Sequence, residues 1–228
     1  MAGLTLDRVA ERAREAGLRL RGAFHVRPDD AVPIAAATIA LVGWVGSEFW
    51  STFATSPEAA DGEPNPLDRW SRRGIDAIAS DLGATALYPF SGPPWLPFQR
   101  WARRAEPVAV SPLGILIHPD FGLWHSYRGA LAFGERLELP AIPARASPCT
   151  TCAEKPCLTT CPVSAFSFAG YDVAGCRSHI ATPAGSGCMS GGCLARAACP
   201  VGARLRYAPA QAAFHMRAFL RSPHLPGP

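Results

Sequence analysis

The residues with the clearest chemical potential in this chain are its eight cysteines, which all lie in one short stretch of the 228-residue sequence. The first 148 residues contain none, and the stretch holds Cys149, Cys152, Cys157, Cys161, Cys176, Cys188, Cys193 and Cys199. Thiols stay reduced in the cytosol, so cysteines this close together indicate metal ligation rather than disulfide bonds. Eight thiolates fill two four-cysteine sites with none left over.

The cysteines belong to an imperfect repeat. Residues 157–165 read Cys-Leu-Thr-Thr-Cys-Pro-Val-Ser-Ala, and residues 193–203 read Cys-Leu-Ala-Arg-Ala-Ala-Cys-Pro-Val-Gly-Ala. Closely spaced cysteines on a tight loop can supply three corners of a [4Fe–4S] cube, whose fourth thiolate then comes from elsewhere. The pattern predicts two such clusters and a role in electron transfer. Four residues separate Cys152 from Cys157, where about two are usual, and a pair of four-cysteine zinc sites is the alternative.

The composition otherwise describes an ordinary globular protein, with 48% hydrophobic and 18% charged residues, a mean hydropathy of +0.07 and a net charge of +4. Residues 1–22 carry too many charges to contain the apolar core of a secretory signal. The longest apolar stretch, residues 31–46, is too short to span about 30 Å of hydrocarbon. The arginines are scattered rather than gathered into a basic run. We therefore expect a cytoplasmic protein with no membrane span and no nucleic-acid partner.

Hydrophobic periodicity predicts the elements that must position these cysteines. It predicts helices at residues 6–16, 47–53, 68–82, 98–104 and 211–220. Runs of apolar and β-branched residues predict strands at residues 38–44, 85–88, 113–117 and 126–133. The last two strands would form a hairpin around a turn at residues 118–122. Residues 56–66 are expected to be an exposed loop.

A proline-rich run at residues 140–148 marks a sharp change in composition, and we place a domain boundary there. The prediction is an α+β domain at residues 1–145, followed by a small iron–sulfur domain with a C-terminal tail at residues 146–228. Two clusters alone would not require a first domain of this size with so many aromatic residues, so we expect that domain to bind something.

From Cys149 to Pro200, including the segment Cys176-Arg-Ser-His179-Ile, the sequence resembles the ferredoxin-like domain of epoxyqueuosine reductases and reductive dehalogenases. Both families reduce their substrates with a corrinoid. In two-cluster ferredoxins the cysteine before proline ligates the other cluster. The resemblance therefore implies one cluster at Cys149, Cys152, Cys157 and Cys199, and another at Cys161, Cys176, Cys188 and Cys193. Epoxyqueuosine reductases continue into RNA-recognising helical repeats, whereas 28 residues follow Pro200, so we do not expect transfer RNA modification.

A second resemblance lies upstream. Residues 111–129, which read Ser-Pro-Leu-Gly-Ile-Leu-Ile-His-Pro-Asp-Phe-Gly-Leu-Trp-His-Ser-Tyr-Arg-Gly, are similar to a segment of the cobalamin-processing CblC-type proteins. Those proteins have a nitroreductase-like α+β fold. The resemblance implies that this segment borders a pocket for cobalamin or flavin, with His118, Trp124 and Arg128 as the cofactor-binding candidates. No catalytic residue is predicted.

Together these patterns predict an α+β protein with a nitroreductase-like, CblC-like domain followed by a ferredoxin-like 2[4Fe–4S] domain. Its function would be that of an iron–sulfur oxidoreductase that passes single electrons to a corrinoid, in cobalamin reduction or processing. One alternative is a ferredoxin-type electron carrier whose first domain docks a redox partner protein. Another is a nonenzymatic interaction module stabilised by metal.

Overall fold

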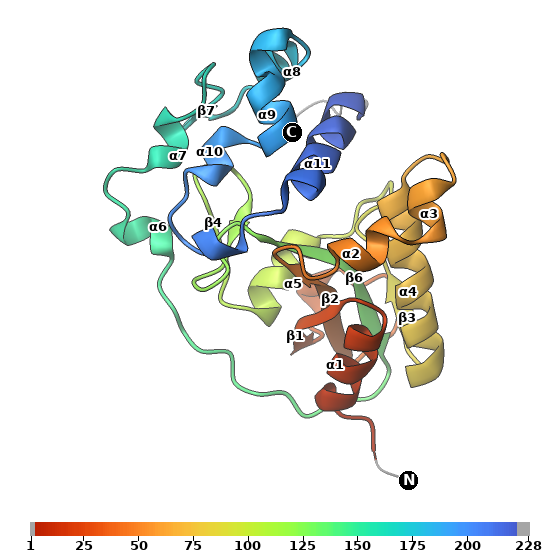
Figure 1. Cartoon of the computed structure of the whole chain (residues 1–228). Coiled ribbons are helices and arrows are strands. Elements are labelled where there is room, and N and C mark those ends of the chain that lie inside the picture. Colours follow the sequence, from red (N-terminus) through yellow and green to blue (C-terminus); the bar gives the residue numbers. More distant parts are fainter. Residues whose placement is uncertain (1–2, 223–228) are drawn as a thin grey trace. The chain divides into compact units, whose positions relative to one another are not determined.

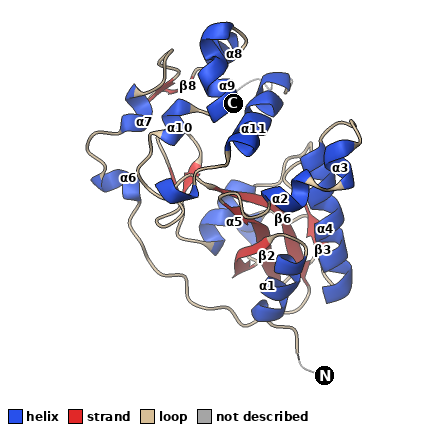
Figure 2. Cartoon of the chain, in the orientation of Figure 1, coloured by secondary structure: helices blue, strands red, loops and turns tan. Residues whose placement is uncertain are grey.

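The N-terminal part of the chain is built on a four-stranded antiparallel sheet. The computed structural model describes residues 3–222, and the sheet has the strand order β1-β2-β6-β3 (Figure 1 and Figure 2). Its strands are β1 (Arg19–His25), β2 (Thr38–Val45), β3 (Thr85–Leu87) and β6 (His125–Phe133). Every residue of β2 is buried, as expected of an apolar strand with a neighbour on each side.

Helices pack against this sheet and remove its apolar side chains from water. They are α1 (Leu6–Glu15), α2 (Trp50–Ala54), α3 (Pro57–Ala60), α4 (Pro66–Leu82) and α5 (Phe98–Ala105), with a 3-10 turn at Pro28–Asp30. Helix α4 packs on β3 and β6 and buries apolar residues at helical spacing, including Trp70, Ile75 and Ile78. It ends at Gly83, whose φ of +66° is the left-handed conformation that glycine adopts most easily after a helix.

The cysteines lie among much shorter elements. The strands here are β4 (Ala109–Val110), β5 (Leu116–Ile117), β7 (Phe166–Ser167) and β8 (Gly170–Tyr171). The helices are α6 (Pro148–Thr151), α7 (Pro156–Thr159), α8 (Val173–Ile180), α9 (Ser186–Gly191), α10 (Leu194–Ala197) and α11 (Pro209–Arg221), with 3-10 turns at Pro183–Gly185 and Ala203–Leu205. They share a buried cluster formed by Leu113, Ile117, Leu123, Phe166, Ala195 and Cys199. Cysteine side chains are therefore part of the apolar core itself.

The chain divides into two compact units. The N-terminal unit runs up to Val108 and resumes at His125–Arg145, and the cysteine unit comprises Ala109–Trp124 together with the chain from Ala146 onward. Among the described residues, every helix is too short or too polar to cross a membrane.

Several predicted elements are confirmed, and one arrangement is wrong. The helices expected at 6–16, 68–82, 98–104 and 211–220 and the strands at 38–44, 85–88 and 126–133 are present within a few residues. The expected hairpin between residues 113–117 and 126–133 does not form, because β5 pairs with β4 whereas β6 lies between β2 and β3. The expected loop at 56–66 contains α3, and β1 was not predicted.

Residues 109–124, which the sequence placed in the first domain, pack in the cysteine unit instead. Two glycines show how closely they do so. A Cβ on Gly122 would lie 1.9 Å from the carbonyl oxygen of Val201, and a Cβ on Gly202 would lie 2.5 Å from the carbonyl group of Phe121. Both glycines have positive φ, +59° and +65°, so the turn and the loop after Cys199 meet backbone to backbone.

Candidate metal centres

Four cysteines line one cavity of the cysteine unit. They are Cys149, Cys152, Cys157 and Cys199, and the cavity has an empty volume of about 320 Å³ with open solvent at its mouth included. The remaining lining residues are Pro112, Ile117, Pro148, Lys155, Pro156, Pro200 and Val201. We call these four cysteines the first set. The first set contains Cys199, which is far from the other three in sequence.

Local structure explains how the first set is held. The hydroxyl oxygen of Ser147 caps α6 by accepting the backbone N–H of Cys149 at 3.3 Å. Lys155 has a positive φ of 40°, which turns the chain into α7, and its ammonium donates to the carbonyl oxygen of Cys152 at 3.0 Å. The turn therefore places the ammonium of Lys155 against the backbone of Cys152, at the cavity that the first set lines.

Electrostatics shows that the first set is a group of close neighbours. Burial raises the pKa of Cys157, and the nearby sulfurs of Cys199, Cys149 and Cys152 raise it further. Burial also raises the pKa of Cys199, with Cys149 and Cys152 adding to the effect. Several thiolates in this cavity would repel one another unless a cation neutralised them. The donor set therefore fits a metal cluster, since metal ions stabilise the thiolate form of cysteine.

The other four cysteines form a second set of neighbours. Burial raises the pKa of Cys176, with Cys161 and Cys188 among the further causes. Burial likewise raises the pKa of Cys193, with Cys176 and Cys188 contributing. The second set is therefore Cys161, which follows α7, Cys176 in α8, Cys188 in α9 and Cys193, which immediately precedes α10.

The second set also receives hydrogen bonds at sulfur. The backbone N–H of Ala165 donates to the Sγ of Cys161 at 3.4 Å. Burial raises the pKa of Cys193, and the backbone N–H groups of Arg196 and Ala195 in the first turn of α10 oppose that rise. Hydrogen bonds of this kind stabilise negative charge on ligand sulfurs.

The two sets exchange one cysteine between the sequence repeats. Cys161 follows the first three cysteines in the chain but belongs to the second set, whereas Cys199 follows Cys193 but belongs to the first set. This grouping is the one that the resemblance to two-cluster ferredoxins implies. Ligation by these residues stays a prediction. Within residues 3–222, no three His, Cys, Asp or Glu side chains are arranged to hold a single metal ion.

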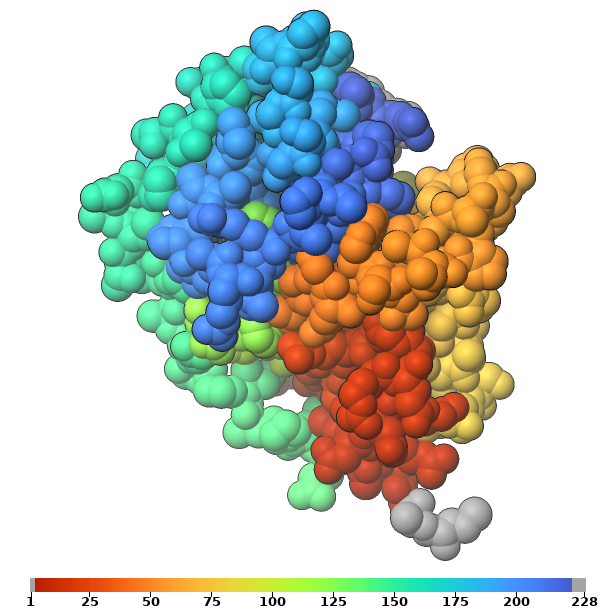
Figure 3. Space-filling view, viewed as in Figure 1, coloured from red at the N-terminus to blue at the C-terminus, as the bar shows by residue number. Residues whose placement is uncertain are grey.

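The cysteine sites lie near the surface of their unit. Cys188 and Cys199 are buried, and the other cysteines are partly buried. Figure 3 shows the segment from α6 to α10, coloured teal to blue, on the visible face.

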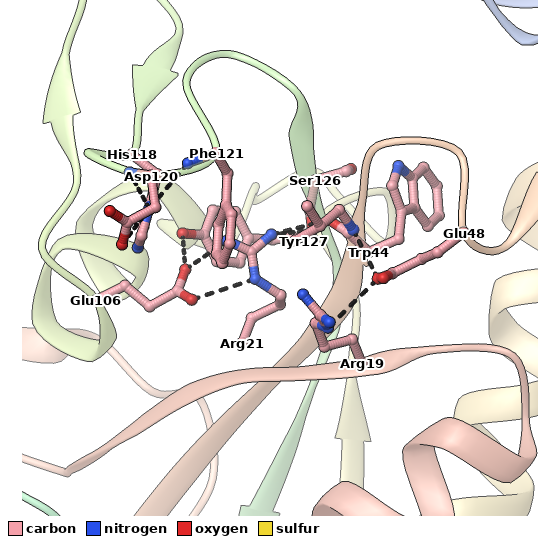
Figure 4. Close-up of polar contacts among 11 residues, drawn as sticks. Arg19, Arg21, Trp44, Glu48, Glu106, His118, Asp120, Phe121, Ser126 and Tyr127 are labelled. Carbon is pink, nitrogen blue, oxygen red and sulfur yellow. Dashed lines mark hydrogen bonds and ion pairs between the residues drawn. The ribbon is translucent and has the colours of Figure 1, made fainter. Parts of the chain in front are cut away.

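The proposed cofactor residue His118 stabilises a turn. Its Nδ1 accepts the backbone N–H groups of Asp120 and Phe121 at 3.0 and 3.3 Å, and its ring stacks on that of Phe121 with centroids 4.2 Å apart (Figure 4). The neutral form of the imidazole is the one that accepts at this nitrogen.

Trp124 and Arg128 lie in different units. Trp124, in the cysteine unit, packs against the ring of Tyr207, and the guanidinium of Arg196 lies 4.7 Å from its ring centre. The indole N–H of Trp124 is buried and has no hydrogen-bond acceptor among the described residues. Arg128, in the N-terminal unit, donates to the Ser71 hydroxyl at 3.1 Å and also binds the carboxylate of Asp68. A cofactor role for His118, Trp124 and Arg128 stays a prediction.

Sequence reasoning missed a buried ionic network in the N-terminal unit (Figure 4). Arg21 is 1% exposed and donates to both carboxylate oxygens of Glu106, at 3.2 and 2.8 Å, and to the carbonyl oxygen of Trp44 at 2.9 Å. The hydroxyl of Tyr127 donates to the same carboxylate. Burial raises the pKa of Glu106, and Arg21 and Tyr127 oppose that rise. No sequence pattern joins residues so far apart in the chain.

Comparisons with known proteins place the fold. No protein-family model matches the sequence, and no curated protein matches it. The structure is similar to a crystal structure of selenomethionine-labelled epoxyqueuosine reductase, with a TM-score of 0.54 and 14% sequence identity over 91% of this chain and 68% of that chain. The chain therefore shares a mixed α+β fold with that protein.

Proposed function

We propose that this chain holds two [4Fe–4S] clusters, one in each set of four cysteines, and passes single electrons through them to a corrinoid. The observation that carries the proposal is the interleaved grouping of the cysteines, in which Cys161 and Cys199 each join the set of the other repeat. Such an exchange is the arrangement of two-cluster ferredoxins. Its consequence is that each cluster ties together loops distant in sequence.

The chemistry of the donors supports iron–sulfur clusters over isolated ions. All eight donors are cysteine sulfurs, the ligands that iron–sulfur clusters require, and the first set surrounds a cavity rather than converging on a point. Burial raises the pKa values of Cys149 and Cys199, and the cationic side chains of Lys155 and Arg206, respectively, oppose that rise. These residues fit an anionic cluster.

Two likenesses support a corrinoid as electron acceptor. The fold is similar to that of an epoxyqueuosine reductase, and residues 111–129 resemble cobalamin-processing proteins. A bound corrinoid would supply a cobalt centre that accepts electrons. The buried indole N–H of Trp124 is a donor suited to an amide oxygen of such a ligand. A flavin is the other cofactor that the upstream resemblance allows.

The first experiment is analysis of anaerobically purified protein. We expect about eight irons and about eight labile sulfides per chain, with broad charge-transfer absorption near ~400 nm. Stoichiometric zinc in place of iron would overturn the cluster assignment and support two four-cysteine zinc sites.

The second experiment tests the corrinoid. Dithionite-reduced protein should bind added cob(III)alamin in equilibrium dialysis and convert it to a lower oxidation state faster than a Cys149→Ala/Cys152→Ala variant. Arg128→Ala should weaken cobalamin retention without removing iron. If cobalamin neither binds nor changes its spectrum while the iron content stands, the protein is the ferredoxin-type carrier with a partner-docking first unit.

A further inference from the structure

The spacing between two cysteines of the first set is longer than two-cluster ferredoxins require. Four residues, Ala-Glu-Lys-Pro at 153–156, separate Cys152 from Cys157, where about two are usual. Lys155 in this insertion is also the only lysine in the 228-residue sequence, since every other member of the Lys and Arg total is an arginine. The insertion therefore carries a residue type that the chain uses nowhere else.

The backbone at Lys155 is not one that lysine favours. Its φ of 40° and ψ of 57° lie in the left-handed region, which glycine and asparagine enter more easily. The same chain offers a comparison at Asn65, which has φ of 52° and ψ of 48° and is likewise followed by a proline that begins a helix, α4. Asparagine would therefore serve the turn before α7 at least as well. The turn alone does not account for a lysine at this position.

The side chain of Lys155 lies at the cavity that the first set lines. Its ammonium donates to the carbonyl oxygen of Cys152 at 3.0 Å, and Lys155 is itself one of the lining residues. Apart from the four cysteines, the other lining residues are prolines, one isoleucine and one valine, so among the described residues the ammonium is the one basic group in this lining. The insertion thus places a positive charge in an otherwise apolar wall around four sulfurs.

We propose that Lys155 raises the reduction potential of the first-set cluster, and that the four-residue insertion serves to position its ammonium. The inference rests on the proposed function, since it requires a cluster in the first set. Reduction adds one electron, and hence one negative charge, to the cluster. A positive charge held nearby in apolar surroundings stabilises that reduced form. Lys155 is therefore a positioning residue that acts by its charge, and it biases an added electron toward the first set.

The test is a redox titration of Lys155→Asn, followed by EPR. Asparagine keeps the left-handed turn, as Asn65 does before α4, and removes the charge. We expect unchanged iron content and a first-set cluster that is about tenfold harder to reduce, which is a fall of about 59 mV for a one-electron couple. The second-set cluster should shift much less and serves as the internal control. Lys155→Arg, which keeps the charge, should stay close to the wild-type potential.

Glu154 provides a matched control within the same insertion. Glu154→Gln also removes one charge, but this side chain is exposed to water, which screens its effect. We expect the first-set cluster of Glu154→Gln to become easier to reduce by less than about twofold. If Lys155→Asn shifts the potential no more than Glu154→Gln does, only the overall charge matters and the inference is overturned.

Chemical modification gives a second test that does not depend on a variant assembling its clusters. Acetylation of amines in the cluster-loaded wild-type protein can modify only Lys155 and the N-terminal amine, and it neutralises the ammonium. Lys155→Arg treated in the same way is modified at the N-terminal amine alone, and is the control. Protein shown by mass spectrometry to be acetylated at Lys155 should have a first-set potential lower by about 59 mV.

The outcomes separate this inference from the proposed function. An unshifted first-set potential, with full iron content, in either the acetylated protein or Lys155→Asn would overturn the inference and leave the proposed function intact. Wild-type protein without iron would instead refute the proposed function, and the inference with it.

Discussion

The exchange of cysteines between the two repeats makes a prediction that paired alanine substitutions can test. If Cys149 and Cys157 share a set, removing both leaves the other site complete. If Cys149 and Cys161 belong to different sets, removing both damages each site once. The two double variants delete the same number of thiolates, so they are matched in chemistry and differ only in where the deletions fall.

The iron content expected of each variant follows from the number of ligands that each cluster uses. Each set supplies four thiolates, and a [4Fe–4S] cluster uses four. We therefore expect Cys149→Ala/Cys157→Ala to retain about four irons and about four sulfides per chain, and Cys149→Ala/Cys161→Ala to retain close to none. Cys161→Ala/Cys176→Ala should again retain about four irons, and its EPR spectrum should be the first-set signal alone.

The assay is iron and sulfide analysis of anaerobically purified variants, with EPR to identify the remaining cluster. The rival arrangement places Cys149, Cys152, Cys157 and Cys161 at one cluster, as their order in sequence would suggest. In that arrangement Cys149→Ala/Cys161→Ala would keep about four irons. That outcome would refute the reasoning from the cavity and from the mutual pKa effects of the cysteines.

Two predictions concern the N-terminal unit. Arg21→Met leaves the buried carboxylate of Glu106 without its cation. We expect the free energy of unfolding to fall by about 3 to 5 kcal/mol and the melting temperature to fall by roughly 10 °C. An unchanged melting temperature would contradict a stabilising role for this network. The guanidinium of Arg73 lowers the pKa of Glu58 from 4.5 to about 2, so the stabilisation from this pair is present above about pH 4.5 and is lost as the pH falls through about 2. Side-chain NMR titration should show that value for Glu58, and Arg73→Gln should return it toward 4.5.

The sequence singled out the cysteines as candidate ligands, but it did not predict the path of the chain around them. Clustered thiols and the two Cys-Pro repeats indicate metal ligation without any knowledge of the fold. The grouping of Cys161 with the second set depended on a resemblance, because spacing alone would keep it with its neighbours. The structure brings distant cysteines together through the loop after α10 and the turn at residues 118–122, which meet at two glycines. Backbone contacts of this kind leave no periodic pattern in a sequence.

The wrong hairpin has a similar cause. Residues 113–117 and 126–133 are both apolar and close in the chain, and an antiparallel pair is the simplest arrangement for such runs. The longer run, residues 126–133, lies in β6 and pairs with both β2 and β3. The second half of β6 is buried. The shorter run is then left to pack in the other unit. Burial across the whole sheet decides which strands pair, and a local sequence pattern carries no information about that burial.

The two units differ in the length of their helices, and this difference explains why hydrophobic periodicity predicted the helices of one unit better than those of the other. α4 in the N-terminal unit spans 17 residues and buries a full apolar face, so its pattern is long enough to recognise. In the cysteine unit α6, α7 and α10 have four residues each, far too few for a helix to be stable without tertiary contacts. Cysteines of both sets pack against the core of this unit, where longer elements would normally supply apolar side chains. If the two sets hold the proposed clusters, the ligand bonds would be the strongest constraint on such short segments, and the positions of the cysteines would then specify the fold of this unit more than any secondary-structure pattern does.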